Sequence, residues 1–177
     1  MSVDFRDPPP EEHVFEANGL RHHALVWGPP EREATGPTVL LAHGFLDFAW
    51  SWAPYAVRLA REGRRCVAWD WRGHGETDHV GPGGYYHFPD YVRDLRALRP
   101  QLAEGPVHLV AHSMGGAVAC MYAGLTPPGL ATVTVIEGRG PPEWVTKRSP
   151  VKVERWLETL DRLDRKPPKV VPSLEDG

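Results

Sequence analysis

The sequence contains no long apolar run and no concentration of charge of one sign. No stretch approaches the roughly 20 apolar residues of a membrane-spanning helix, and residues 1–12 lack the basic and apolar regions of a secretory signal. The 20 Lys and Arg and the 23 Asp and Glu are interspersed, which argues against nucleic acid or a membrane surface as a partner. We therefore expect a cytoplasmic protein whose partner is a small molecule.

Cysteine is also scarce, and the sequence has only two. Cys66 and Cys120 fall in apolar segments, which favours buried free thiols over a disulfide. His22 and His23 are adjacent in a predicted strand, so their side chains face opposite sides, and no Cys or His spacing resembles a zinc site. Glycine loops of the dinucleotide or P-loop type are missing too. The sequence therefore predicts no metal and no cofactor.

Apolar strands and helices alternate along most of the chain. Asn18-Gly19 separates two short alternating runs, 13–17 and 20–27, and this pattern predicts an antiparallel hairpin. Beyond the hairpin, strands are predicted at 38–42, 64–69, 107–111 and 131–136, and helices at 50–62, from Pro89 onward and at 114–125. The alternation predicts an α/β fold, with a mostly parallel sheet, helices on both faces and the hairpin at its N-terminal end.

The two ends of the chain differ in composition from the part between them. Residues 1–12 are polar and rich in proline, which predicts a disordered lead-in. Residues 13–145 hold the alternating elements and form the predicted core. Residues 146–177 combine an amphipathic segment, 151–164, with a polar, proline-rich tail.

Four marked turns follow predicted strands, and they contain His43, Asp70, Ser113 and Glu137. Ligand sites of open α/β sheets lie beyond the carboxyl ends of the strands. The four turns are therefore expected to meet at one edge of the sheet and to form the functional site there.

Ser113 is the candidate nucleophile. It lies between a buried strand and an apolar helix, and its neighbours Ala111, Gly115 and Gly116 are small, as a tight strand-turn-helix elbow requires. Such a turn exposes the hydroxyl to a substrate and to a base that takes its proton. The alternative is that Ser113 only caps the helix, but a cap does not explain the small neighbours.

The residues around Ser113 have predicted supporting roles. The main-chain amides of Phe45 and Met114 are the expected oxyanion donors, and Gly44 permits the bend before Phe45. His43 is interpreted as a buried structural histidine, because it lies on the loop that shapes the oxyanion hole. His112 is expected to point away from the reaction and to pack.

Acidic residues follow two of the strands. Glu137 ends the strand after the nucleophile helix, where a carboxylate could orient a histidine base, although a solvated loop glutamate fits the composition equally well. Asp70 and Arg72 are expected to fix their loop through hydrogen bonds and an ion pair.

Taken together, these turns resemble the α/β-hydrolase superfamily, in its serine-hydrolase-like branch. The matching segments are His43-Gly44-Phe45-Leu46-Asp47, Asp70-Trp71-Arg72-Gly73-His74-Gly75, Ala111-His112-Ser113-Met114-Gly115-Gly116 and Glu137-Gly138-Arg139-Gly140-Pro141. The resemblance implies about six of eight core strands and then the start of a helical cap. Dehalogenases and epoxide hydrolases of the family use aspartate as nucleophile, so Ser113 implies ester-like or other small acyl substrates.

No histidine follows Ser113 in this sequence. The family order is nucleophile, acid, histidine, so the resemblance implies a chain truncated before its catalytic histidine. Strand 131–136 would then be an exposed apolar edge, through which the chain could self-associate. Two functions stay open: a serine hydrolase that works through an acyl-enzyme and is inactive as this chain stands, or a non-catalytic binding or interaction module.

Overall fold

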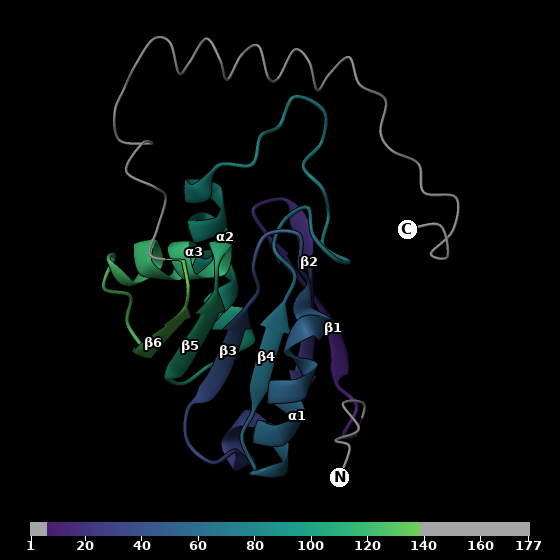
Figure 1. Ribbon diagram of the computed structural model, residues 1–177, viewed down its shortest axis with the longest axis vertical. Helices are drawn as coiled ribbons and strands as arrows, with labels where there is room; N and C mark the ends of the chain where they lie inside the picture. The colour runs from purple at the N-terminus through teal and green to yellow at the C-terminus, as the bar shows by residue number, and fades with distance from the viewer. Residues whose placement is uncertain (1–6, 139–177) are drawn as a thin grey trace. The chain divides into compact units, whose positions relative to one another are not determined.

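A computed structural model describes residues 7–138 of the chain (Figure 1). The strands are β1 (Glu11–Ala17), β2 (Leu20–Trp27), β3 (Thr38–Ala42), β4 (Cys66–Trp69), β5 (Val107–His112) and β6 (Leu130–Ile136). The helices are α1 (Ala53–Arg61), α2 (Phe88–Leu102) and α3 (Met114–Ala123), with short 3-10 turns η1 (Glu31–Glu33) and η2 (Ala49–Trp52). The strands form one sheet in the order β1-β2-β4-β3-β5-β6.

The first two strands form the predicted antiparallel hairpin. Asn18 and Gly19 both have positive φ, 54° and 80°, as a two-residue hairpin turn requires. β2 continues antiparallel to β4, whereas β3 pairs in parallel with β4 and β5. The predicted α/β class, with a mostly parallel sheet behind an N-terminal hairpin, is confirmed.

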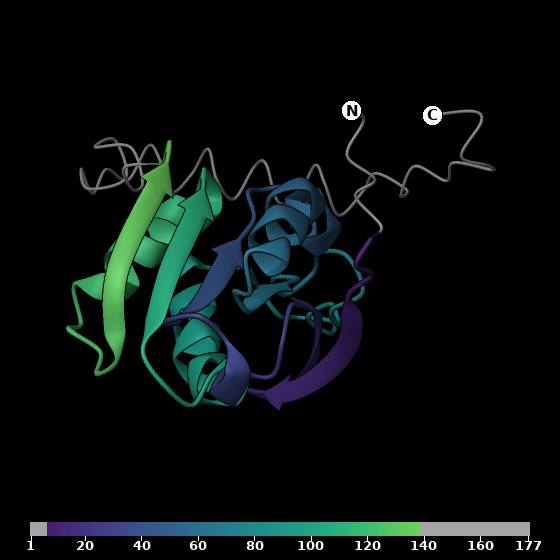
Figure 2. The same cartoon turned by 90° about the horizontal axis from the view of Figure 1, so that it is seen from below.

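Side chains of the central strands alternate between two apolar clusters, one on each face of the sheet. In β3, Leu40 and Ala42 pack with α2 and α3, whereas Val39 and Leu41 pack with α1. This alternation is the period of two that a strand imposes on its side chains. The whole of β3 is buried, as expected of a parallel strand covered on both faces, and Figure 2 shows α1 and α2 on opposite sides of the sheet.

The apolar helix predicted at 114–125 is α3 (Met114–Ala123), and it is buried on its inner side only. Val118 and Tyr122 pack into the core, but Cys120 and Met121 are exposed. Within residues 7–138, α3 packs against the sheet and α2 with one side only. Cys120 is therefore an exposed free thiol and not the buried one expected. Cys66 is buried as predicted, and burial raises the pKa of its thiol to about 12.

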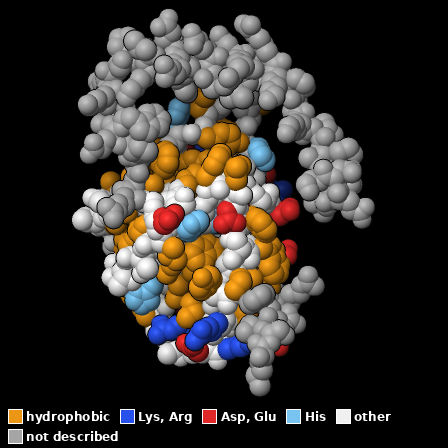
Figure 3. Space-filling model, viewed as in Figure 1, with side chains coloured by type: hydrophobic (Ala, Val, Ile, Leu, Met, Phe, Trp, Pro, Cys, Tyr) orange, Lys and Arg blue, Asp and Glu red, His pale blue; other side chains and the backbone are white. Residues whose placement is uncertain are grey.

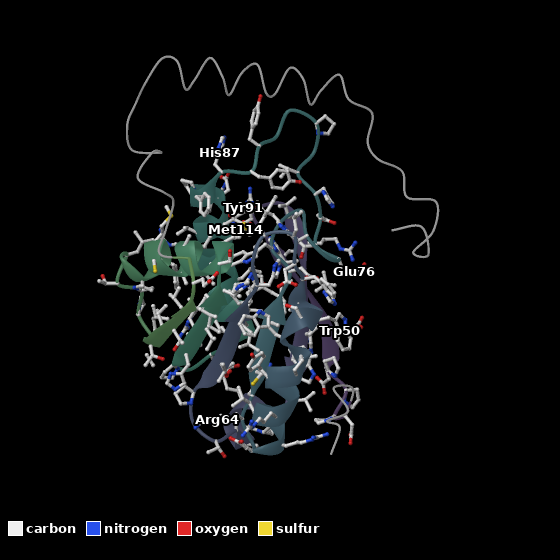
Figure 4. The ribbon with its side chains drawn as sticks, viewed as in Figure 1. Trp50, Arg64, Glu76, His87, Tyr91 and Met114 are labelled. Carbon is white, nitrogen blue, oxygen red and sulfur yellow. The ribbon has the colours of Figure 1, made fainter. Side chains whose placement is uncertain are left out.

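The carboxyl ends of the four parallel strands lie at one edge of the sheet. The pairing register brings Ala42 of β3 opposite Trp69 of β4 and Ala111 of β5. The residues that follow the four strands are His43, Asp70, Ser113 and Glu137. Figure 4 shows Met114 at this end of the sheet and Arg64 at the opposite end. The four turns therefore share an edge, as the sequence indicated.

β6 is the last strand of the sheet in the described part of the chain. It pairs with β5 on one side, and Ala131, Thr132, Thr134 and Ile136 are exposed. No residue of β6 carries a charge. An uncharged, β-branched edge of this kind is able to accept a further strand.

The domain boundaries are only partly covered by the structure. β1 begins at Glu11, two residues before the predicted core, because Glu11 and Glu12 pair with the end of β2. The predicted lead-in 1–12 is thus too long at its C-terminal end. The last part of the predicted core, 139–145, and the predicted cap and tail, 146–177, lie outside the described residues. Among the helices of the described residues, none is long and apolar enough to cross a membrane.

Candidate active site

Ser113 occupies a strained turn between β5 and α3. Its backbone angles are φ 49° and ψ −113°, a region that L-residues rarely adopt. Its N–H donates to the carbonyl of Ile136 at 3.1 Å, which ties the turn to the end of β6. The turn leaves the side chain partly accessible at the carboxyl end of the sheet. This is the geometry that a nucleophile elbow requires.

The hydroxyl of Ser113 does not cap α3. Ser113 precedes the helix, but its side chain makes no hydrogen bond to the first turn. Among residues 7–138 the hydroxyl has no hydrogen-bond partner at all. The capping alternative is therefore wrong.

Two glycines allow the backbone to pass closely around the elbow. A Cβ on Gly115 would lie 2.5 Å from the carbonyl oxygen of His43 and 2.8 Å from that of Ala42. A Cβ on Gly116 would lie 2.6 Å from the carbonyl oxygen of Glu137. These contacts are with backbone, which cannot move aside as a flexible side chain can. The small residues of the motif are therefore required by packing.

The loop after β3, residues 43–48, lies directly against Ser113, and we call it the oxyanion loop after its predicted role. A Cβ on Gly44 would lie 3.3 Å from Cβ of Ser113, so only glycine allows this close approach without displacement. Neither the N–H of Phe45 nor that of Met114 has an acceptor within the described residues. Two free main-chain donors beside a serine hydroxyl are what an oxyanion hole needs.

His43 is fully buried, and both of its ring nitrogens are occupied. Nδ1 lies 2.7 Å from the carbonyl oxygen of Gly44, and Nε2 accepts the main-chain N–H of Trp71 at 3.1 Å. These partners require the tautomer with its proton on Nδ1. Burial lowers the pKa of His43 to about 4, so the ring is neutral. With its lone pair already accepting a hydrogen bond, His43 is not available as a base.

Asp70 connects three segments at the sheet edge. Its carboxylate accepts hydrogen bonds from Nδ1 of His23 at 2.8 Å, the N–H of Ala49 at 2.6 Å and the N–H of Glu76 at 3.1 Å. Burial alone would raise the pKa of Asp70, but these hydrogen bonds outweigh it and hold the pKa below its usual range. The hydrogen bond to Asp70 raises the pKa of His23 in turn. Asp70 thus fixes its loop, as expected.

Arg72 forms its ion pair with Asp94 of α2. The guanidinium donates to the Asp94 carboxylate at 2.6 and 2.7 Å, and both side chains are buried. Asn18 of the hairpin turn donates to the same carboxylate at 2.7 Å. This bidentate pair holds the loop after β4 against α2 and the hairpin.

The side chain of His112 lies on the opposite side of the elbow from α3. It lines a cavity of about 300 Å³ together with Asp47, Ser51, Trp52, Tyr55 and Ile136. Its Nδ1 would be 3.0 Å from a Cβ on Gly44. His112 therefore packs behind the oxyanion loop.

Glu137 follows β6 and is exposed to solvent, with a positive φ of 62°. Its position next to the Ser113 turn agrees with the expected place of an acid. Its carboxylate has no hydrogen-bond partner among the residues described. The structure therefore brings Glu137 to the site without orienting its side chain.

Large hydrophobic side chains are exposed beside the elbow, on the loop that follows β3. Phe45 is 65% exposed, Leu46 83% and Phe48 48%. Figure 3 shows hydrophobic side chains over much of one face of the described residues. Apolar surface next to the Ser113 turn suits the apolar part of a small ligand.

Several residues of the site gave no local signal in the sequence. Asp94, His23 and Asn18 are 22 to 76 residues away from their partners along the chain. The ring of His74 meets that of Phe45 edge to face, with the ring centroids 5.8 Å apart. Such contacts depend on the sheet order, which the periodicity of one sequence does not give. No cluster of three or more metal-ligating side chains occurs within residues 7–138.

A family model for the alpha/beta hydrolase fold matches residues 37–170, which is most of the chain. The chain belongs to this family. The strained serine turn, the glycine contacts and the order of the parallel strands are thus features of an alpha/beta hydrolase core.

Similar proteins include a serine hydrolase-like protein and epoxide hydrolases. A serine hydrolase-like protein of Danio rerio is 35% identical over 65% of this chain and 34% of its own length. Epoxide hydrolase B of Mycobacterium tuberculosis is 32% identical over 72% of this chain and 36% of its own length. Among solved structures, a thioesterase domain from the curacin biosynthetic pathway superposes with a TM-score of 0.78 at 29% identity, covering 92% of this chain and 56% of that one.

This alpha/beta hydrolase chain spans about a third to a half of the length of these relatives. The matched part carries the sheet edge with Ser113, the oxyanion loop and Glu137. It carries no histidine beyond Ser113.

Proposed function

We propose that this chain supplies the nucleophile and the oxyanion donors of a serine hydrolase that acts on ester-like or other small acyl substrates. The observation that carries the proposal is the strained backbone of Ser113, with its hydroxyl free at the carboxyl end of the parallel strands. Strain of this kind is maintained only by close packing, here the contact of Gly115 with the backbone of β3.

The reaction proceeds through an acyl-enzyme. Oγ of Ser113 attacks the carbonyl carbon, its proton passes to a base, and the carbonyl oxygen becomes an oxyanion. The N–H groups of Phe45 and Met114 donate to this oxyanion. The leaving alcohol takes up the proton, and water then releases the acid and restores Ser113. Glu137 is in place to orient the base.

We propose no histidine of this chain as the base. His43 is neutral and accepts a hydrogen bond on its free nitrogen, and His112 packs into the cavity behind the oxyanion loop. No histidine follows Ser113 in the sequence. Triads that lose one member keep only a small part of their rate, about 10³- to 10⁴-fold over water. The chain is therefore expected to turn over substrate very slowly.

Steady-state hydrolysis of a short-chain p-nitrophenyl ester tests this function. The expected result is slow hydrolysis that disappears in Ser113→Ala and persists in Ser51→Ala, a serine on η2 outside the elbow. Equal rates in the chain and in Ser113→Ala would overturn the nucleophile. Turnover at an ordinary enzyme rate, about 1 s⁻¹ or more, would instead show that one of the nine histidines acts as base.

A non-catalytic interaction module is the second candidate. The unpaired edge of β6 in the described part of the chain favours it, because an uncharged β-branched strand pairs readily with a second copy. On this alternative Ser113 is inert and the chain self-associates through residues 131–136.

A further inference from the structure

A second cavity, of about 520 Å³, lies between the C-terminal half of α2 and the segment that follows α3. We name it the α2–α3 cavity. Its lining includes Arg96, Arg99 and Tyr122 as polar side chains, and Pro100, Leu125 and Pro127 as apolar ones. Its volume falls within the range of small-molecule sites, about 300–1,000 Å³. Tyr122 lies roughly two turns of α3 beyond Met114, about 12 Å along the helix axis, so this cavity is separate from the Ser113 elbow.

Neither arginine is paired with a carboxylate within residues 7–138. Arg99 donates to the carbonyl oxygens of Gly105 at 2.6 Å and Gly129 at 3.3 Å, and its Nε is buried without a partner. Arg96 is exposed and makes no hydrogen bond or ion pair with the described residues. The carboxylate of Glu31 accepts the N–H groups of Glu104 and Gly105 and makes no ion pair with Arg99. The cavity therefore carries two guanidinium charges that nothing in the described chain neutralises.

The other lining residues add a hydroxyl group and apolar surface to the cavity. The ring of Tyr122 is buried, and its hydroxyl has no partner among the residues described. Burial raises the pKa of this hydroxyl, and the charges of Arg99 and Arg96 act in the opposite direction, which indicates that both guanidiniums lie near it. Pro100 and Pro127 have a fixed φ, so the apolar walls keep their shape without a ligand.

We propose that the α2–α3 cavity binds a small amphipathic carboxylate. Arg96 and Arg99 hold the carboxylate, because guanidinium groups match its two oxygens in geometry and charge. The apolar part lies against Leu125 and the prolines, and the hydroxyl of Tyr122 donates to a carboxylate oxygen. The site is independent of the reaction at Ser113, so its failure would leave the proposed hydrolase function unchanged.

Titration of the full ¹⁵N-labelled chain with 4-phenylbutyrate, followed by NMR, tests the proposal. The expected result is saturable shifts at the amides of residues 96–99 and 122–126 and none at 112–115. Arg96→Gln should weaken binding about tenfold, because a charge-assisted hydrogen bond is lost. Arg93→Gln is the matched control: Arg93 is also an exposed arginine of α2 but does not line the cavity. Arg96 has no structural partner among the described residues, so its replacement is expected to leave the fold intact.

Several outcomes would overturn the proposal. These are no shift at millimolar probe, equal effects of Arg96→Gln and Arg93→Gln, or equally tight binding of the neutral analogue 4-phenylbutanamide. Tighter binding of phenyl phosphate than of 4-phenylbutyrate would replace the carboxylate by a phosphate ester as the ligand. Shifts confined to residues 112–115 would assign the probe to the Ser113 site and leave the α2–α3 cavity without a ligand.

Discussion

Trp71 donates both of its N–H groups to His43. Its main-chain N–H reaches Nε2 at 3.1 Å, and its indole N–H reaches the carbonyl oxygen at 3.0 Å. His43 directly precedes the Gly44-Phe45 segment of the oxyanion loop. The loop after β4 therefore fixes the start of the loop after β3, which carries Phe45.

Replacing Trp71 by Phe should destabilise the chain through this hydrogen bond. The carbonyl of His43 would be left buried and unpaired, at a cost of about 1–3 kcal/mol. Trp69→Phe is the matched control, because Trp69 is equally buried but its indole N–H has no partner. In urea unfolding we expect Trp71→Phe to lose more free energy of unfolding than Trp69→Phe. Equal losses would mean that the bond to His43 contributes nothing.

Gly115→Ala should disrupt the elbow. The added Cβ would lie 2.5 Å from the carbonyl oxygen of His43, so β3 and α3 must separate. Overpacking of this kind costs about 1–3 kcal/mol or more. Gly81→Ala serves as control, since a Cβ there meets nothing within 4 Å. Thermal unfolding should show a clear loss for Gly115→Ala and little change for Gly81→Ala; comparable melting temperatures would contradict the packing described for the elbow.

The buried neutral state of His43 predicts a pH dependence of stability. Its pKa falls from 6.5 in the unfolded chain to about 4 in the folded one. As the pH falls below 6.5, the unfolded chain binds a proton that the folded chain does not, so stability decreases until about pH 4. The contribution is on the order of 3 kcal/mol.

His43→Gln removes the ionisable imidazole and keeps a side-chain amide that can form hydrogen bonds. Its free energy of unfolding, measured in urea between about pH 7 and pH 4, should fall less steeply than that of the unchanged chain. His22, His23 and Asp70 also have shifted pKa values, and these three groups are present in both proteins. Parallel pH profiles of the two proteins would show that the pKa of His43 is the same in the folded and the unfolded chain.

The unpaired edge of β6 predicts concentration-dependent self-association. A lysine at Thr134, in the middle of the exposed edge, should suppress it, because pairing would then bring like charges together. Arg58→Lys on α1 keeps its charge and is the control. Sedimentation velocity should show dimers for the chain and the control and monomers for Thr134→Lys. A chain that is monomeric at every concentration, or association that Thr134→Lys leaves unchanged, removes the support for the interaction module.

The hairpin and the central sheet could be predicted because each follows a local pattern. The Asn18-Gly19 turn has the positive φ values that its sequence implies, and β3 spans the predicted residues 38–42. Which sides of α3 are covered could not be predicted, since an apolar composition shows that a helix can be buried but not how many of its sides are covered. Cys120 lies on the uncovered side.

The candidate site was predictable where a residue follows a strand end, and not where it depends on a distant partner. Ser113, Gly44 and Glu137 lie where their strands place them. The pairing of Arg72 with Asp94 requires that α2 pack beneath the loop after β4, which no local sequence pattern states. The role of Trp71 in holding His43 depends in the same way on the adjacency of β3 and β4.

The proposed function requires Ser113 to be a competent nucleophile that lacks only its base. Mass spectrometric mapping of acetylation by p-nitrophenyl acetate, with imidazole added as an external base, tests it most directly. We expect Ser113 to be acetylated faster than the exposed Ser51, and imidazole to increase this difference. Acetylation of Ser113 and Ser51 at the same rate, with and without imidazole, would contradict it.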